Sequence, residues 1–108
     1  MENKTIYALQ SGICKALANP SRIEIIALLN KGEMSFGDIL KILAISKSNL
    51  SQHLSVMVAN GLVISRKEGT NSYFRLSSSK VALACQTMRE VLISNLNSKI
   101  NLLNTLEK

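Results

Sequence analysis

One helical stretch, from Ile45 to Gly61, constrains the fold more than any other part of the chain. Its apolar residues, which recur at helical spacing and predict a buried side, are Leu50, Leu54, Met57 and Val58. Its short polar residues on the opposite side are Ser48, Ser51, Gln52 and Ser55. Such residues form helices less readily than the Glu and Lys of most solvated faces. An acid-free face of hydroxyls and amides suits close approach to a polyanion or to base edges, although an ordinary surface helix remains the alternative.

Capping signals place a shorter helix directly before this stretch. Ser35 and Asp38 match a helix start, with a hydroxyl at the N-cap and an acid near the positive end of the helix dipole. The chain turns at Ile45, and Ser46 caps the next helix. Two short helices joined by a tight turn predict a helix-turn-helix over residues 35–60.

The periodicity changes from helical to extended after Gly61. Residues 62–67 and 72–77 predict two strands, and the glycine-containing segment 68–71 predicts the turn between them. We call this hairpin, residues 62–77, the wing; its basic residues are Arg66, Lys67 and Arg75. Between positions 41 and 75 there are five basic residues and one acid, in a chain of net charge +6, which favours an anionic partner such as nucleic acid.

Helices are also predicted over residues 5–18, 20–30 and 79–106, and Asn19-Pro20 marks the start of the second of these. The first and last carry long apolar stripes, which include Ile6, Leu9, Ile13 and Leu17 in one and Met88, Leu92, Leu96, Ile100 and Leu103 in the other. A domain of 108 residues cannot cover the longer stripe by itself. Residues 1–18 and 79–106 are therefore predicted to be dimerisation helices, in which the last helix pairs with its copy or with the first helix of a second chain. The alternative is that the end of the last helix is frayed and merely amphipathic.

The length of the chain fits a single domain, residues 1–108, which we expect to be mainly α with a small β-hairpin. Its core should be aliphatic, because 46% of the residues are hydrophobic and only 4% are aromatic. No apolar signal segment or membrane-spanning run is evident, so we expect a cytoplasmic protein. Cys14 and Cys85 are too few for a disulfide framework. The single histidine, His53, lies in the polar helix, and neither a metal nor a cofactor is expected.

Four segments in combination carry a resemblance to a known family. They are LANPSRIEIIALL, SFGDI, SKSNLSQHLSVMVANGLV and RKEGTNSYFRL. Together they look like the arsenic-repressor (ArsR/SmtB) family of bacterial transcription regulators, over most of the chain. The resemblance implies a winged helix-turn-helix homodimer joined through its first and last helices. It further implies a repressor that binds an inverted-repeat operator in double-stranded DNA and is released by an inducer.

The family's DNA-contact roles fall on Lys47, Ser48, Asn49, Ser51, Gln52 and His53 in the polar helix and on Arg66, Lys67, Thr70 and Asn71 of the wing. The side-chain chemistry agrees, because Asn49 and Gln52 can make bidentate contacts to adenine and Lys47 can reach guanine or phosphate. His53 either contacts DNA or forms a hydrogen bond across the helix-turn-helix. The wing residues would meet phosphates or a minor groove. In a two-fold dimer the two reading helices should lie ~34 Å apart, or a multiple of that.

The sensor sites common in that family have no match here. Residues 33–39 lack the cysteines that bind soft metals. The positions matching a zinc site between last helices are Ser78, Lys80, Val91 and Ser94, and those matching redox cysteines are Ala27 and Ile93. Cys14 and Cys85 remain, on the two predicted dimer helices: they form a thiol sensor of oxidants, reactive sulfur or arsenite, or they are small apolar fillers.

Two other classes of function compete with a DNA reader. A winged helix also serves as a protein-interaction module, but the basic hairpin and the acid-free helix face argue against that alternative. An enzyme is not predicted, because the sequence has no paired carboxylates, no nucleophile–base pair and no phosphate-binding glycine loop. Ser51 and His53 are two positions apart and point to different sides of their helix.

Overall fold

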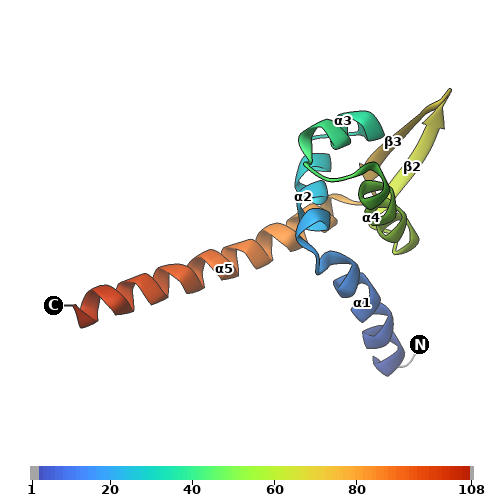
Figure 1. Cartoon of the computed structure of the whole chain (residues 1–108). Helices are drawn as coiled ribbons and strands as arrows, with labels where there is room; N and C mark the ends of the chain where they lie inside the picture. The colour runs from blue at the N-terminus through green and yellow to red at the C-terminus, as the bar shows by residue number, and fades with distance from the viewer. Residues whose placement is uncertain (1–2, 108) are drawn as a thin grey trace.

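The computed structural model describes residues 3–107, so Met1, Glu2 and Lys108 at the ends of the predicted domain lie outside the described residues. Its elements are, in order, α1 (Asn3–Leu17), α2 (Pro20–Leu29), β1 (Met34–Ser35), α3 (Phe36–Ile42), α4 (Lys47–Ala59), β2 (Val63–Glu68), β3 (Asn71–Leu76) and α5 (Ser79–Leu106). Helices α2, α3 and α4 gather against the strands, and α1 and α5 extend away from this head (Figure 1). The predicted mainly α fold with a wing is confirmed.

Side-chain caps fix where the three helices of the head begin. The Asn19 side chain accepts hydrogen bonds from the backbone N–H groups of Ser21 and Arg22 at the start of α2. Ser35 accepts from the N–H of Asp38 in α3, and Ser46 accepts from that of Asn49 in α4. Each such cap satisfies a donor that the helix leaves unpaired, worth ~1 kcal/mol. The sequence-based helix starts at these positions are confirmed.

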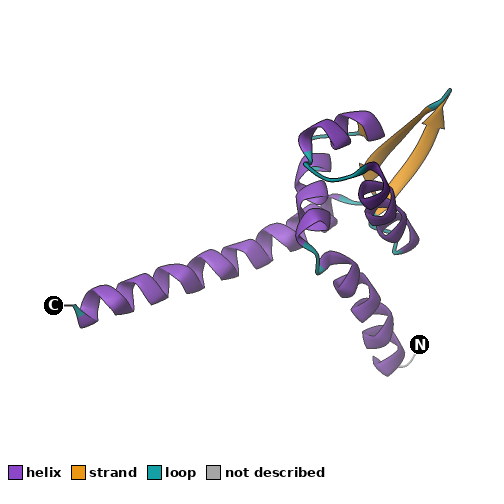
Figure 2. Ribbon diagram, viewed as in Figure 1, coloured by secondary structure: helices purple, strands orange, loops and turns teal. Residues whose placement is uncertain are grey.

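The wing is part of a three-stranded antiparallel sheet, in the order β1-β3-β2 (Figure 2). The sequence predicts only the β2–β3 hairpin. Strand β1 has two residues, too few to show the alternation of apolar and polar residues by which a strand is recognised. Its pairing with β3, Met34 to Phe74, joins residues far apart in the chain. The turn is also shorter than predicted: Glu68 pairs with Asn71, which leaves Gly69-Thr70, where Gly69 has φ +62°.

The core lies between α2, α3, α4 and the base of the wing. Its fully buried side chains are Ile25, Ile26, Ile39, Leu50, Leu54, Met57 and Val63. Three of these come from the predicted apolar side of α4, so the opposite, polar side has to face outward. Val58 is an exception to that prediction: it is 37% exposed and lies on the side of α4 that faces the wing.

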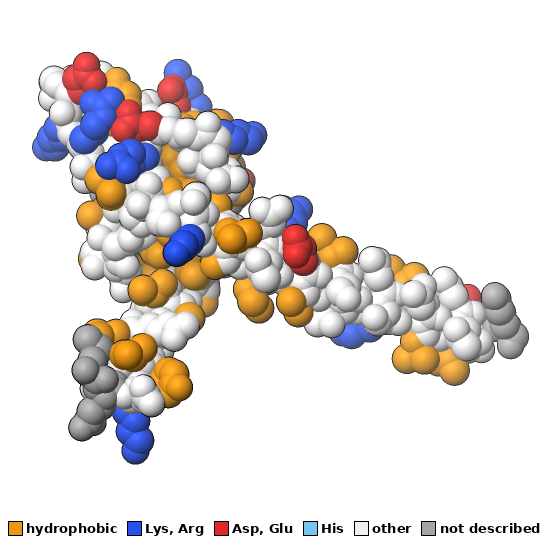
Figure 3. Space-filling model, turned by 180° about the vertical axis from the view of Figure 1, so that it is seen from behind, with side chains coloured by type: hydrophobic (Ala, Val, Ile, Leu, Met, Phe, Trp, Pro, Cys, Tyr) orange, Lys and Arg blue, Asp and Glu red, His pale blue; other side chains and the backbone are white. Residues whose placement is uncertain are grey.

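Helices α1 and α5 leave their apolar stripes uncovered. Only Ala16 of α1 and Ala82 of α5 are buried, both at the ends that join the head. Along the rest of the 28-residue α5, Leu96 is 48% exposed, and Leu92 and Leu103 are more so. Hydrophobic side chains follow both arms in Figure 3. Two helices with this much exposed apolar surface are suited to a protein interface.

Candidate nucleic-acid interface

Helix α4 presents its polar side to solvent. Lys47, Ser48, Asn49, Ser51 and Gln52 are all exposed. The Ser46 and Ser48 hydroxyls lie 3.3 Å apart, whereas Ser51 and Gln52 make no side-chain hydrogen bond within residues 3–107. Donors and acceptors without internal partners are available to an external ligand. Five of the six residues predicted from this helix thus share one accessible surface.

His53, the sixth, is half-buried and faces the interior of the head. Its Nδ1 accepts a hydrogen bond from Nε of Arg22 in α2, at 3.2 Å. The Nη1 of Arg22 also donates to the carbonyl oxygen of Ala16, at 3.4 Å. Of the two alternatives for His53, the structure shows an internal hydrogen bond, made to α2. Sequence reasoning missed Arg22, because its partner lies 31 positions away.

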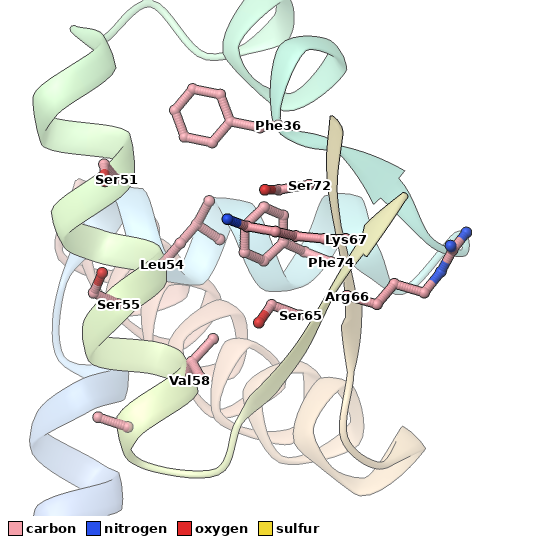
Figure 4. Close-up of a pocket in the computed structure, with 11 residues that line it drawn as sticks. Phe36, Ser51, Leu54, Ser55, Val58, Ser65, Arg66, Lys67, Ser72 and Phe74 are labelled. Atoms are coloured by element: carbon pink, nitrogen blue, oxygen red, sulfur yellow. The ribbon is translucent and has the colours of Figure 1, made fainter. Parts of the chain in front are cut away.

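A groove of about 520 Å³ separates α4 from the wing. The residues that line its α4 side include Ser51, Ser55 and Val58, and those that line its wing side are Ser65, Arg66, Lys67, Ser72 and Phe74. In Figure 4 the Lys67 side chain extends across the groove towards α4. Among the described residues that line the groove, none is acidic, so its hydroxyls and the Lys67 ammonium group can accommodate an anion. Ser55, Ser65 and Ser72 are additional candidates here; strand alternation predicts that residues 65 and 67 share a face.

Arg66 lies on the other face of the sheet and points away from the groove (Figure 4). Its Nη2 donates to Oε1 of Glu33 at 2.6 Å, and its Nε donates to Oε2 of the same carboxylate at 3.0 Å. Its Nη1 donates to Oε2 of Glu68 at 2.9 Å. The guanidinium also stacks 4.6 Å from the ring centre of Tyr73. These hydrogen bonds lower the pKa of the Glu33 carboxyl and raise that of Arg66.

The tip of the wing projects beyond the head, and both Thr70 and Asn71 are exposed there (Figure 2). Arg75, the remaining basic residue of the hairpin, is also exposed. Lys67, Thr70 and Asn71 are thus accessible along with the polar face of α4. Two of the predicted DNA-contact residues, the half-buried His53 and the exposed Arg66, are hydrogen-bonded to side chains of other elements.

The two cysteines occupy different environments. Cys14 is exposed on α1, whereas Cys85 is half-buried on α5 and packs against the core. Burial raises the pKa of the Cys85 thiol, which reduces the fraction of reactive thiolate near neutral pH. Within residues 3–107 no three His, Cys, Asp or Glu side chains come together as a metal site. No helix in the same range has the length and apolar character needed to cross a membrane.

A helix-turn-helix with an outward-facing polar helix, followed by a basic hairpin, defines the winged helix-turn-helix class of DNA-binding domain. Comparisons with known proteins agree. Residues 19–65 match the model of the family described as bacterial regulatory protein, arsR family. The HTH-type transcriptional regulator Rv0081 of Mycobacterium tuberculosis is 32% identical, over 98% of this chain and 94% of that protein. The chain belongs to the arsR family of bacterial transcriptional regulators.

Solved structures and a functionally named relative support the same assignment. The crystal structure of Rv0081 matches with a TM-score of 0.80, at 31% identity, over 93% of this chain and 99% of that one. The homodimeric winged helix-turn-helix domain of Mb0332 from Mycobacterium bovis matches with a TM-score of 0.79, at 27% identity, over 91% and 93%. The arsenical resistance operon repressor of Staphylococcus aureus is 34% identical, over 82% of this chain and 86% of that protein.

Proposed function

We propose that the protein is a homodimeric repressor that binds an inverted-repeat operator and leaves it when an inducer arrives. One observation carries the proposal: the exposed side of α4 has hydroxyls, amides and a lysine, has no acid, and has no role in the core. Repression is inferred from the similarity to the arsenical resistance operon repressor. The protein carries out no chemical reaction in this role.

The exposed apolar sides of α1 and α5 support the homodimer. Burying side chains such as Leu92 and Leu96 is favourable by about 25 cal/mol for each Å² removed from water. The homodimeric domain of Mb0332 has the same fold. A two-fold dimer presents two copies of α4, which explains why an operator with inverted symmetry is proposed.

Each group of exposed residues has a role in the proposed complex. Asn49, Ser51 and Gln52 read base edges in the major groove, while Lys47 and Ser48 contact guanine or backbone phosphate. Lys67 reaches a phosphate that lies in the groove between α4 and the wing. Thr70 and Asn71 at the wing tip approach the neighbouring minor groove. The proposal is tested by selecting bound sequences from a random DNA library, which should yield a two-fold symmetric site.

Replacing Lys67 with alanine should weaken binding to operator and non-operator DNA by similar factors. A lysine that neutralises one phosphate releases counterions, so its loss should reduce the slope of log Kd against log salt by about 0.9 per subunit. Fluorescence anisotropy titrations over a range of salt concentrations measure this slope. Lys31→Ala removes the same charge from an exposed loop beyond the groove and should leave the slope unchanged. Equal slopes for both variants would contradict the phosphate contact.

A further inference from the structure

Arg66 and Lys67 are adjacent basic residues of β2, but their side chains serve opposite faces of the sheet. Both residues border the groove beside α4, but the Lys67 side chain extends across it, whereas the Arg66 side chain points away from it (Figure 4). Side chains alternate along a strand, so the two cannot contact the same phosphate backbone through the same surface. The two adjacent basic residues that the sequence places in the wing, Arg66 and Lys67, therefore have different surroundings.

The surroundings of Arg66 are unfavourable for DNA phosphate. Its guanidinium lies between the carboxylates of Glu33 and Glu68, and Arg75 is a second cation close enough to act on Glu33. A phosphate would have to displace a bidentate carboxylate while being repelled by two acids. Bidentate arginine–carboxylate pairs are among the stronger charge-assisted hydrogen bonds, and the Tyr73 ring covers one side of the guanidinium.

The same contacts connect all three strands. Arg66 comes from β2, Tyr73 from the central strand β3, and Glu33 lies immediately before β1. Pairing of β1 with β3 covers only two residues, and a two-stranded hairpin alone is marginally stable in water. A side chain that spans the sheet from one edge strand to the other therefore restrains the wing relative to the head.

We infer that Arg66 is a positioning residue of the wing and that Glu33 is its partner. By holding the three strands together on one face, the pair keeps Lys67 and the wing tip at a fixed orientation to α4 on the other face. This inference rests on the proposed DNA-reading function, because the orientation matters only if α4 and the wing bind one duplex together.

The test compares Glu33→Gln, Arg66→Gln and the double variant in the full-length protein. Glu24→Gln is the matched control, because Glu24 is an exposed acid of α2 with no ion pair among the described residues, and its replacement changes net charge as Glu33→Gln does. Thermal unfolding establishes that each variant is folded. Hydrogen exchange of residues 63–76 reports wing order, and anisotropy titrations against salt report DNA contacts.

We expect both single variants to accelerate hydrogen exchange in the wing and to weaken operator binding by about two- to fivefold. This factor corresponds to the interaction free energy that an exposed ion pair usually contributes. The double variant should be no worse than Arg66→Gln alone, because Arg66→Gln already removes the pair with Glu33 together with the contacts to Glu68 and Tyr73. The slope of log Kd against log salt should match that of wild type. If Arg66→Gln does not fold, Glu33→Gln alone still tests the inference, since it leaves the hairpin sequence intact.

Two results would overturn the inference. If Glu33→Gln tightens binding while Arg66→Gln lowers the salt slope by about 0.9 per subunit, Arg66 is a phosphate ligand that Glu33 competes for. If wing exchange is unchanged in both single variants, the pair restrains nothing. Failure of the proposed function is distinguishable, because wild type would then select no DNA site, while the exchange measurement would still report on the pair.

Discussion

Replacing Ser51 and Gln52 with alanine should reduce operator affinity by about ten- to a hundredfold or more while changing non-specific affinity little. Gln52 can make a bidentate contact to a base, and each such contact is worth about 1–3 kcal/mol of discrimination. Both side chains are exposed and make no internal hydrogen bond within residues 3–107, so their loss costs the fold nothing. Alanine also favours helix more than serine does. Competition titrations of operator DNA against a scrambled duplex of equal length measure the effect.

The ratio of the two affinities, and not either affinity alone, decides whether α4 reads bases. Ser79→Ala is a suitable control, because Ser79 is an exposed serine at the start of α5. It should leave both affinities at the wild-type values. If the Ser51 and Gln52 variants weaken operator and scrambled DNA by the same factor, α4 contacts only the backbone and sequence must be read elsewhere.

Replacing Leu96 with glutamate should separate the homodimer and abolish tight operator binding. A charge placed on the apolar stripe of α5 would have to be buried without a partner if the dimer formed. A monomer contacts only one half-site, so its affinity for the operator should fall by a factor of about 10²–10⁴. Analytical ultracentrifugation measures the assembly state, and anisotropy titrations measure operator binding.

Ser98→Glu introduces the same charge on the opposite side of α5, two residues away. It should remain dimeric and bind the operator as wild type does. A Leu96→Glu protein that stays dimeric would show that α5 does not form the interface, and the exposed stripe would need another partner. Circular dichroism should show a folded head in both variants, since Leu96 lies outside the core cluster.

Local chemistry made much of the head predictable. Asn19, Ser35 and Ser46 fix helix starts through hydrogen bonds to N–H groups two or three residues ahead, and such short-range signals can be read from sequence. The buried side of α4 was predictable for Leu50, Leu54 and Met57 because their spacing matches the helical period. Val58 shares that spacing but is partly exposed.

Contacts between distant residues were not predictable from one sequence. Strand β1 is defined only by its pairing with residues of β3 such as Phe74, about 40 positions away in the chain. The role of Glu33 likewise depends on the side chain of Arg66, 33 positions away. His53 and Arg66 matched DNA-contact positions by residue type and place in the motif. Their internal partners, Arg22 and Glu33, became apparent only once the chain was folded. Contact between DNA and the predicted residues, His53 and Arg66 included, stays a prediction.

The separation of roles on α4 has an evolutionary consequence. Leu50, Leu54 and Met57 stabilise the head, whereas Ser48, Ser51 and Gln52 contribute no packing to it. Exposed substitutions of that kind usually change stability by less than about 0.5 kcal/mol. After gene duplication, one copy of the protein could therefore come to recognise a new operator through substitutions on the polar side of α4 alone, with no compensating change in the core.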